Sequence, residues 1–211
     1  MTPLTIPGVQ EYLAGLFPSP DPILREMEEE AQRRDFPIVG PLVGALLEVL
    51  SRAIDARSIL ELGSGYGYSA FWFSRGVANP GRIVLTDRKS ENLEQARRNL
   101  ERAGFPHAYE FAVGDALDRL ARSEETWDIV FCDVDKAAYP EVIAPAAERL
   151  RAGGLLIFDN MLRSGKVLPE AGPGDAATEG VRRANRMLAS HPGLRTTLVP
   201  LRDGVTVSVR L

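Results

Sequence analysis

The sequence has few of the residues that indicate secretion, membrane insertion or nucleic-acid binding. Cys132 is the single cysteine among 211 residues, so no disulfide can form within the chain, which is typical of a reducing compartment. Lys and Arg number 25 against 29 Asp and Glu, so no overall positive field attracts nucleic acid or an anionic membrane. No apolar run reaches the length of a membrane span, and the N-terminus lacks a signal-peptide pattern. We therefore expect a cytoplasmic protein with neither nucleic acid nor membrane as partner.

What the sequence does contain is an alternation of short apolar runs with longer helical patterns. Most of the apolar runs are continuous rather than alternating, which is typical of strands covered on both faces. Strand followed by helix followed by strand predicts a parallel sheet with right-handed crossovers. The predicted strands are 58–63, 82–87, 109–115, 127–133, 154–160, 196–201 and 205–211. The last two flank Arg202-Asp203-Gly204, which predicts a tight hairpin and a final antiparallel strand.

Apolar residues at helical spacing predict helices between these strands and before the first of them. The predicted helices are 23–34, 41–54, 90–104 and 139–154. A chain of this length forms one core comfortably, so we predict a single α/β domain over residues 1–211. It combines a helical cap at 1–57 with a doubly wound, Rossmann-like seven-stranded core at 58–211. The Gly- and Pro-rich stretch 164–178 predicts a loop and a candidate lid.

A glycine loop follows the first predicted strand, and ligands of open α/β sheets bind beyond the carboxyl ends of strands. Gly63, Gly65 and Gly67 form a GxGxG pattern. A dinucleotide fingerprint needs a small residue where Tyr68 stands, and no P-loop lysine follows the glycines. Glu61 beside the loop repels anions and favours a cationic ligand. Alternatively, the glycines only make a tight turn from strand to helix.

Asp87 ends the second predicted strand, where an acidic residue is placed to bind ribose hydroxyls. A ribose, an adenine and a positively charged group together make up S-adenosylmethionine (SAM). The glycine loop and Asp87 taken together therefore favour a SAM site over a bare turn.

Five segments in succession resemble the motifs of a known enzyme family. They are ILELGSGYGYSAFW (59–72), IVLTD (83–87), VGDA (113–116), DIVFCDVDKAAYP (128–140) and LLIFDN (155–160). In this order they resemble class I SAM-dependent O-methyltransferases, above all the metal-dependent group that includes catechol and caffeoyl-CoA O-methyltransferases. The resemblance extends from about Pro37 to the C-terminus. Jointly the motifs are specific, although each alone is weak.

The resemblance implies a cofactor site spread over several strand ends. Glu61 and Ser69 match positions at the methionine end of SAM, and Asp87 matches the acidic residue that binds the ribose. Asp115 and Ala116 match the pair that meets the adenine. The full set of expected cofactor-binding residues is Glu61, Gly63, Gly65, Tyr66, Ser69, Asp87, Asp115, Ala116 and Asp133.

The resemblance also implies a divalent-metal site, with Asp133, Asp159 and Asn160 as ligands and Lys136 as catalytic base. Three oxygen ligands suit Mg²⁺, with Mn²⁺ or Ca²⁺ as alternatives, and do not suit Zn²⁺. Such a metal would orient the two hydroxyls of a catechol and lower the pKa of the one that is methylated. Alternatively, Asp133 caps a helix and Lys136 is solvated. Asp159-Asn160 at the adjoining strand end favours the metal site.

The resemblance thus implies an enzyme that methylates a catechol or phenylpropanoid-like small molecule. Because homodimers are common in this family, we also expect a homodimer that pairs through the N-terminal helices. Two alternatives stay open. An NAD(P)-dependent Rossmann oxidoreductase is opposed by Tyr68 and by the lack of a hydride-transfer set. A non-catalytic SAM-binding module is opposed by the complete set of proposed ligands. The segment 36–43 is also expected to approach the cofactor or the substrate.

Overall fold

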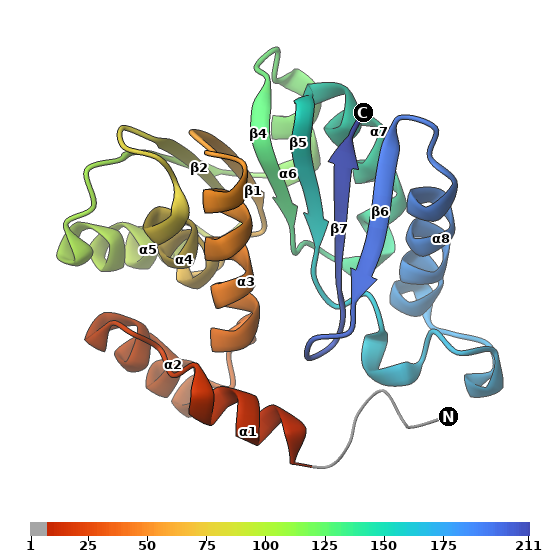
Figure 1. The fold of residues 1–211 in the computed structure, drawn as a ribbon, viewed down its shortest axis with the longest axis horizontal. Coiled ribbons are helices and arrows are strands. Elements are labelled where there is room, and N and C mark those ends of the chain that lie inside the picture. The colour runs from red at the N-terminus through yellow and green to blue at the C-terminus, as the bar shows by residue number, and fades with distance from the viewer. Residues whose placement is uncertain (1–7) are drawn as a thin grey trace.

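Seven strands form one sheet in the computed structural model, which describes residues 8–211 (Figure 1). The strands are β1 (Ser58–Leu62), β2 (Arg82–Asp87), β3 (Ala108–Val113), β4 (Trp127–Cys132), β5 (Leu150–Phe158), β6 (Leu194–Val199) and β7 (Val205–Arg210). Their order across the sheet is β3-β2-β1-β4-β5-β7-β6. Neighbouring strands from β3 to β5 are parallel, whereas β7 is antiparallel to both β5 and β6. The doubly wound, mostly parallel sheet with an antiparallel C-terminal strand is therefore confirmed.

Helices cover the sheet on both faces, with one apolar core on each side. The helices are α1 (Val9–Leu16), α2 (Pro22–Arg34), α3 (Gly40–Ala53), α4 (Tyr68–Gly76), α5 (Ser90–Ala103), α6 (Ala116–Arg122), α7 (Tyr139–Arg149) and α8 (Ala176–Ser190). Helices α2 to α5 contribute to the first core and α6 to α8 to the second. Consecutive strand residues such as Ile59 and Leu60 enter opposite cores, because side chains alternate along a strand. Within residues 8–211, no helix is both long and apolar enough to span a membrane.

The sheet changes winding direction between β1 and β4, and this creates the crevice at the strand ends. Strand β1 pairs with β2 on one side and with β4 on the other. Helix α4, which follows β1, packs in the first core, and α7, which follows β4, packs in the second. The chain therefore leaves these two neighbouring strand ends in opposite directions, which opens the place where α/β sheets bind ligands.

Strand β5 begins earlier than the sequence predicts. The glycine pair near the end of the predicted helix 139–154 suggested a helix stop, but α7 ends at Arg149 and the strand starts at the next residue. Gly153 has a φ of +74°, and the pairing of β4 with β5 shifts register between Trp127 and Ile129. The glycines thus form a bulge inside a strand, because glycine reaches a positive φ without steric conflict.

The N-terminal helices do not form a separate layer. Val43 and Leu47 of α3 are fully buried in the first core, so this helix belongs to the main fold. Helices α1 and α2 lie at the edge of the molecule where the parallel strands end (Figure 1). Residues 1–7 of the predicted cap 1–57 lie outside the described part of the chain.

Helix α2 is hydrogen-bonded to the glycine loop and to the first residue of α4. The Tyr66 hydroxyl donates to the Met27 carbonyl oxygen at 2.8 Å, and the Tyr68 hydroxyl donates to Glu28 at 2.6 Å. Tyr66 lies in the glycine loop and Tyr68 begins α4, whereas both acceptors belong to α2. The N-terminal part of the chain therefore builds one wall of the crevice at the strand ends.

Candidate active site

Two cavities of about 210 and 200 Å³ meet at the ends of β1, β2 and β4. Gly63, Asp87 and Asp133 line both cavities, so one extended ligand can reach from the first into the second. The other predicted site residues in the first cavity are Gly65, Tyr66, Ser69, Lys136, Asp159 and Asn160. The second cavity is lined by the predicted adenine pair, Asp115 and Ala116.

The glycine loop allows the ends of β1 and β4 to approach each other closely. Gly63 has a φ of +86°, and a Cβ atom there would lie 2.6 Å from the Asp133 carbonyl oxygen. Gly67 has a φ of +88°, and its Cβ would lie 2.8 Å from that of Ala96 in α5. The glycines therefore make a tight turn and at the same time shape the cavity, so the two interpretations of this loop are compatible.

Glu61 is completely buried in β1 and lines neither cavity. The Ser69 hydroxyl donates a hydrogen bond to its Oε1, while its Oε2 is buried and has no hydrogen-bond partner among residues 8–211. Burial raises the pKa of Glu61 from 4.5 to about 7; the bond from Ser69 opposes the rise. Glu61 therefore carries an acceptor oxygen that is open to a hydrogen-bond donor, directly behind the cavity residue Ser69.

Asp87 is held in one orientation between the two cavities. Its Oδ2 accepts from the backbone N–H of Gly65 at 3.0 Å. Its Oδ1 accepts from the backbone N–H of Lys89 at 2.8 Å and from the Asn92 side-chain amide at 3.1 Å. These bonds fix a carboxylate at the point shared by both cavities.

Asp115 has structural partners that the sequence did not reveal. Its Oδ1 caps α6 by accepting from the backbone N–H groups of Leu117 and Asp118, and its Oδ2 pairs with Arg88 at 2.6 Å. The Arg88 bond is the main reason that the pKa of Asp115 is lowered. Arg88 lines the second cavity and was missed, because nothing in its sequence neighbourhood distinguishes it from a solvated arginine.

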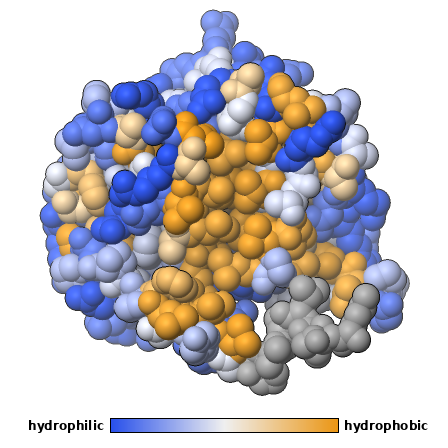
Figure 2. Space-filling model, in the orientation of Figure 1, coloured by the Kyte–Doolittle hydropathy of each residue, from blue (hydrophilic) through white to orange (hydrophobic). Residues whose placement is uncertain are grey.

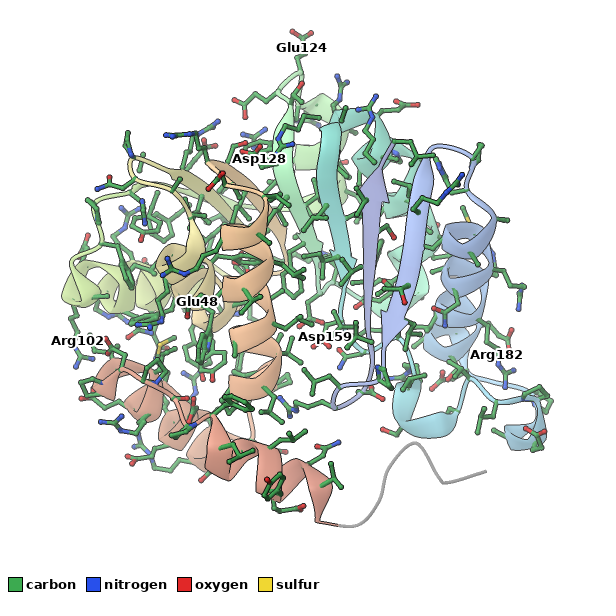
Figure 3. All side chains as sticks on the ribbon, viewed as in Figure 1. Glu48, Arg102, Glu124, Asp128, Asp159 and Arg182 are labelled. Carbon is green, nitrogen blue, oxygen red and sulfur yellow. The ribbon has the colours of Figure 1, made fainter. Side chains whose placement is uncertain are left out.

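Asp133 and Asp159 follow the neighbouring strands β4 and β5 and line the same cavity. Figure 3 shows Asp159 at the edge of the sheet where the parallel strands end. Lys136 Nζ lies 2.6 Å from Asp133 Oδ1. Burial raises the pKa of Asp159, which is 4% exposed, and together with the charge of Asp133 brings it to about 7. Burial also raises the pKa of Asp133, and the charge of Lys136 opposes this rise.

The helix cap at this turn is Asp135, so the capping role does not fall to Asp133. Asp135 Oδ1 accepts from the backbone N–H of Ala137 at 3.1 Å, at the start of the 3-10 turn Lys136–Ala138. The Tyr139 hydroxyl donates to the carbonyl oxygen of Asp159 at 2.9 Å. The carboxylate of Asp133 is thereby left to face the cavity and Lys136.

The donor chemistry of this corner fits a divalent cation. In the part of the chain from residue 8 onward, no group of three or more His, Cys, Asp and Glu side chains is placed to hold a metal. The predicted ligand set has two carboxylates and takes its third oxygen from the amide of Asn160, whose φ is +59°. The buried carboxylate of Asp159, the half-buried carboxylate of Asp133 and the amide oxygen beside them are oxygen donors of the kind that Mg²⁺ prefers.

The cover segment, residues 36–39, closes the first cavity from the side of the N-terminal helices. The ring of Phe36 packs edge-on against Tyr66 at 4.9 Å between centroids. It also lies over the glycine loop, since a Cβ on Gly65 would lie 3.1 Å from it. The sequence suggested that 36–43 approaches the cofactor or substrate, and the structure places the first four of these residues in the cavity wall.

Comparison with known proteins decides which chemistry this geometry serves. The family model described as O-methyltransferase matches residues 19–211. The chain belongs to this O-methyltransferase family. The resemblance of its motifs to class I SAM-dependent O-methyltransferases of the catechol and caffeoyl-CoA type is thereby confirmed.

Relatives of this O-methyltransferase cover almost its whole length. It is 34% identical over 196 residues to the catechol O-methyltransferase of Mycobacterium tuberculosis. The alignment covers 92% of the chain and 88% of that protein. The catechol O-methyltransferase of Niastella koreensis is 31% identical over 92% of the chain and 90% of its own length.

Solved structures of O-methyltransferases share the fold. An O-methyltransferase from Bacillus cereus in complex with SAH aligns with a TM-score of 0.86 and 30% identity over 97% of both chains. The O-methyltransferase TomG from Streptomyces achromogenes in complex with SAM aligns with a TM-score of 0.85 and 31% identity over 96% of both chains. The family membership supports SAM as cofactor and does not favour an NAD(P)-dependent oxidoreductase.

Proposed function

We propose that this O-methyltransferase moves the methyl group of SAM to one of two adjacent hydroxyls of a catechol-type small molecule, with a divalent cation at the site. The observation that carries the proposal is the shared cavity in which Asp133, Asp159 and Lys136 lie next to the glycine loop and Asp87. Proposed cofactor contacts and proposed metal ligands thus meet in one space. The names of two relatives, both catechol O-methyltransferases, support a catechol or phenylpropanoid-like acceptor.

The chain's own residues divide the binding of SAM between the two cavities. Ser69 in the cavity wall receives the methionine end, and the unpartnered Oε2 of Glu61 behind it offers an acceptor to the ammonium group. Asp87 accepts hydrogen bonds from the ribose hydroxyls at the point where the cavities meet. The adenine enters the second cavity against Ala116, next to the ion pair of Asp115 with Arg88.

Asp133, Asp159 and Asn160 hold the cation, and Mg²⁺ is the preferred assignment, with Mn²⁺ or Ca²⁺ as alternatives. When bound, such a cation orients the acceptor and lowers the pKa of its hydroxyl. Lys136 lies beside Asp133, and in its neutral form its amine would accept the proton of that hydroxyl as general base. The cavity walls align the hydroxyl with the methyl group, and this positioning supplies much of the acceleration of a displacement reaction.

The test is the release of SAH with a panel of catechols, including caffeic acid and caffeoyl-CoA, first with Mg²⁺ and then with EDTA. We expect turnover that EDTA abolishes and that added Mg²⁺ restores. Turnover that is indifferent to EDTA would remove the proposed metal site but keep the methyltransferase. Binding of SAH without any turnover across the panel would contradict a catechol-type acceptor and would favour the non-catalytic module.

We also propose that two copies of the chain pair through the apolar face seen in Figure 2. On this face a continuous hydrophobic area lies over α3 and the neighbouring strands β5 and β7, with further apolar side chains on α1. Val49 of α3 is 61% exposed and Val209 of β7 is 38% exposed. Patches of this kind on soluble proteins mark interaction sites, and a second copy can cover the same patch by two-fold symmetry. Helices α1 and α3 would thus contribute, as expected, together with strand β7.

The pairing is tested by measuring molar mass in solution by light scattering. We expect a dimer for the natural protein and a monomer for Val49→Glu. Val113→Glu is the matched control, because Val113 is 59% exposed at the opposite edge strand β3 and should leave the dimer intact. A natural protein that is monomeric at all concentrations would contradict the pairing.

We also propose a cytoplasmic location, and the buried free thiol of Cys132 is consistent with it.

A further inference from the structure

The hairpin loop between β6 and β7 carries an arginine in an unfavourable backbone conformation. Arg202 has a φ of +51°, the left-handed region that residues with a Cβ atom rarely adopt. Its guanidinium Nη1 donates a hydrogen bond of 3.0 Å to the carbonyl oxygen of Ile38, which lies 164 residues earlier in the cover segment. The side chain therefore reaches from the C-terminal hairpin to the wall of the cofactor cavity.

The surface that receives this side chain is shaped for it. Gly40 follows the cover segment directly and has a φ of +74°. A Cβ atom on Gly40 would lie 2.1 Å from Nη1 and 2.8 Å from Cζ of Arg202. The guanidinium thus rests on the bare Cα of Gly40, in a place that every other residue type would occupy with its own side chain.

The other side of the hairpin is bonded to the segment that follows Asp159-Asn160. The backbone N–H of Met161 donates to the Gly204 carbonyl oxygen at 2.9 Å, and that of Leu162 donates to the Asp203 carbonyl oxygen at 2.8 Å. The hairpin is therefore fixed to the side of the cavity that holds the proposed metal ligands. Arg202 extends this attachment to the cover segment on the opposite side.

We propose that Arg202 is a positioning residue that straps the cover segment across the cavity and retains the cofactor. The inference rests on the cofactor half of the proposed function. The cover segment is attached to the glycine loop through Phe36, and the bond from Arg202 to Ile38 attaches it to the other wall. This bond lies at the exposed surface, so it can open when SAM enters or SAH leaves and close again afterwards. A charged donor makes the bond stronger than a neutral one.

The test compares Arg202→Gly with the natural protein in SAH binding, which needs neither acceptor nor metal. Glycine adopts the φ of +51° readily, so the variant should fold with an unchanged or higher melting temperature. We expect its affinity for SAH to fall by roughly three- to tenfold, with most of the change in the dissociation rate. In turnover assays the KM for SAM should rise by a similar factor while kcat stays within twofold.

Two further measurements separate a strap from a general structural role. Hydrogen exchange of the free protein should show faster exchange of the backbone amides at 36–40 in Arg202→Gly. Arg202→Lys should restore part of the SAH affinity, because it keeps a charged donor. Arg122→Ala is the control, since the Arg122 side chain is 83% exposed on α6, and it should change none of these values.

The proposal is overturned if Arg202→Gly binds SAH within twofold of the natural protein or leaves the exchange at 36–40 unchanged. It is also overturned if affinity and melting temperature fall together and Arg202→Lys restores neither. A natural protein that does not bind SAH would instead overturn the cofactor half of the proposed function. Failure of the catechol or metal assignment would leave this test unaffected.

Discussion

The phenol of Tyr139 donates a hydrogen bond of 2.9 Å to the backbone carbonyl oxygen of Asp159. Tyr139 is completely buried at the start of α7, after β4, whereas Asp159 directly follows β5. The bond therefore ties together the ends of the two strands that carry the proposed metal ligands. Together with the bond of 3.3 Å from the Asp159 backbone N–H to the Cys132 carbonyl oxygen, it holds Asp159 in position just beyond the last paired residue of its strand.

Removal of this hydroxyl should affect both stability and the site. Tyr139→Phe leaves a buried carbonyl without its donor, so the free energy of unfolding should fall by about 1–2 kcal/mol. Turnover at limiting Mg²⁺ should also fall, and the loss should shrink at high Mg²⁺. Tyr109→Phe is the matched control, because the Tyr109 hydroxyl donates to Ser74 at 2.9 Å, away from the cavities. If both variants lose turnover equally, the bond has no special role at the site.

Substitution of Asp159 should reduce turnover, whereas substitution of Asp87 should reduce the affinity for SAH. Asp159→Ala should abolish metal-dependent turnover and leave SAH affinity largely intact, because Asp159 lines the first cavity beside the other proposed ligands. Asp87→Ala should weaken SAH binding by roughly tenfold or more, because it loses the carboxylate that both cavities share. Calorimetric titration with SAH and turnover in excess SAM distinguish the two. Full activity of Asp159→Ala would show that the metal assignment is wrong.

The affinity for SAH should depend on pH through Glu61. Its pKa is raised by burial from 4.5 to about 7, so the folded free protein keeps this carboxyl protonated at a pH where the unfolded chain has lost the proton. This contribution to stability is fully present below about pH 4.5 and is lost as the pH rises to about 7, in total about 3 kcal/mol. The ammonium group of the ligand favours the ionised form. Affinity should therefore rise with pH up to about 7 and then level off.

Titration of SAH binding between pH 5.5 and pH 8.5 measures this dependence. Glu61→Gln is the decisive control, since Asp159 also has a pKa near 7 and would contribute its own pH dependence. We expect the variant to bind more weakly and to lose most of the rise below pH 7. An unchanged pH profile in Glu61→Gln would assign the dependence to the metal-site carboxylates.

Gly63 should be the least replaceable residue of the loop. Gly63→Ala adds a Cβ atom 2.6 Å from the Asp133 carbonyl oxygen at a φ of +86°, which combines steric conflict with backbone strain. We expect a loss of about 3 kcal/mol in the free energy of unfolding. Gly104→Ala is the matched control: Gly104 has a φ of +68°, and a Cβ atom there would have no neighbour from residues 8–211 within 4 Å. This variant should lose only about 1 kcal/mol. Equal losses in denaturant titrations would contradict the close approach of β1 and β4.

The sequence alone determined the α/β architecture, because strands buried on both faces need continuous apolar residues and their helices need a helical period. It also placed charged side chains at the strand ends, since Asp133 and Asp159 directly follow an apolar run and Asp87 follows one after a single threonine. The parallel arrangement brings such ends to one edge, so the existence of a site followed from the pattern. The predicted start of β5 was wrong, because a glycine pair in the sequence can mark either the end of a helix or a bulge within a strand.

The tertiary structure decided what no local pattern contains. Asp133 and Asp135 are equivalent as caps in the sequence, and only the fold shows that Asp135 caps the turn while Asp133 faces the cavity. The orphaned oxygen of Glu61 depends on burial from all sides. The contact of Arg202 with Ile38 joins residues 164 positions apart. Such relationships arise from the packing of distant segments, whereas sequence patterns report on neighbours within a few residues.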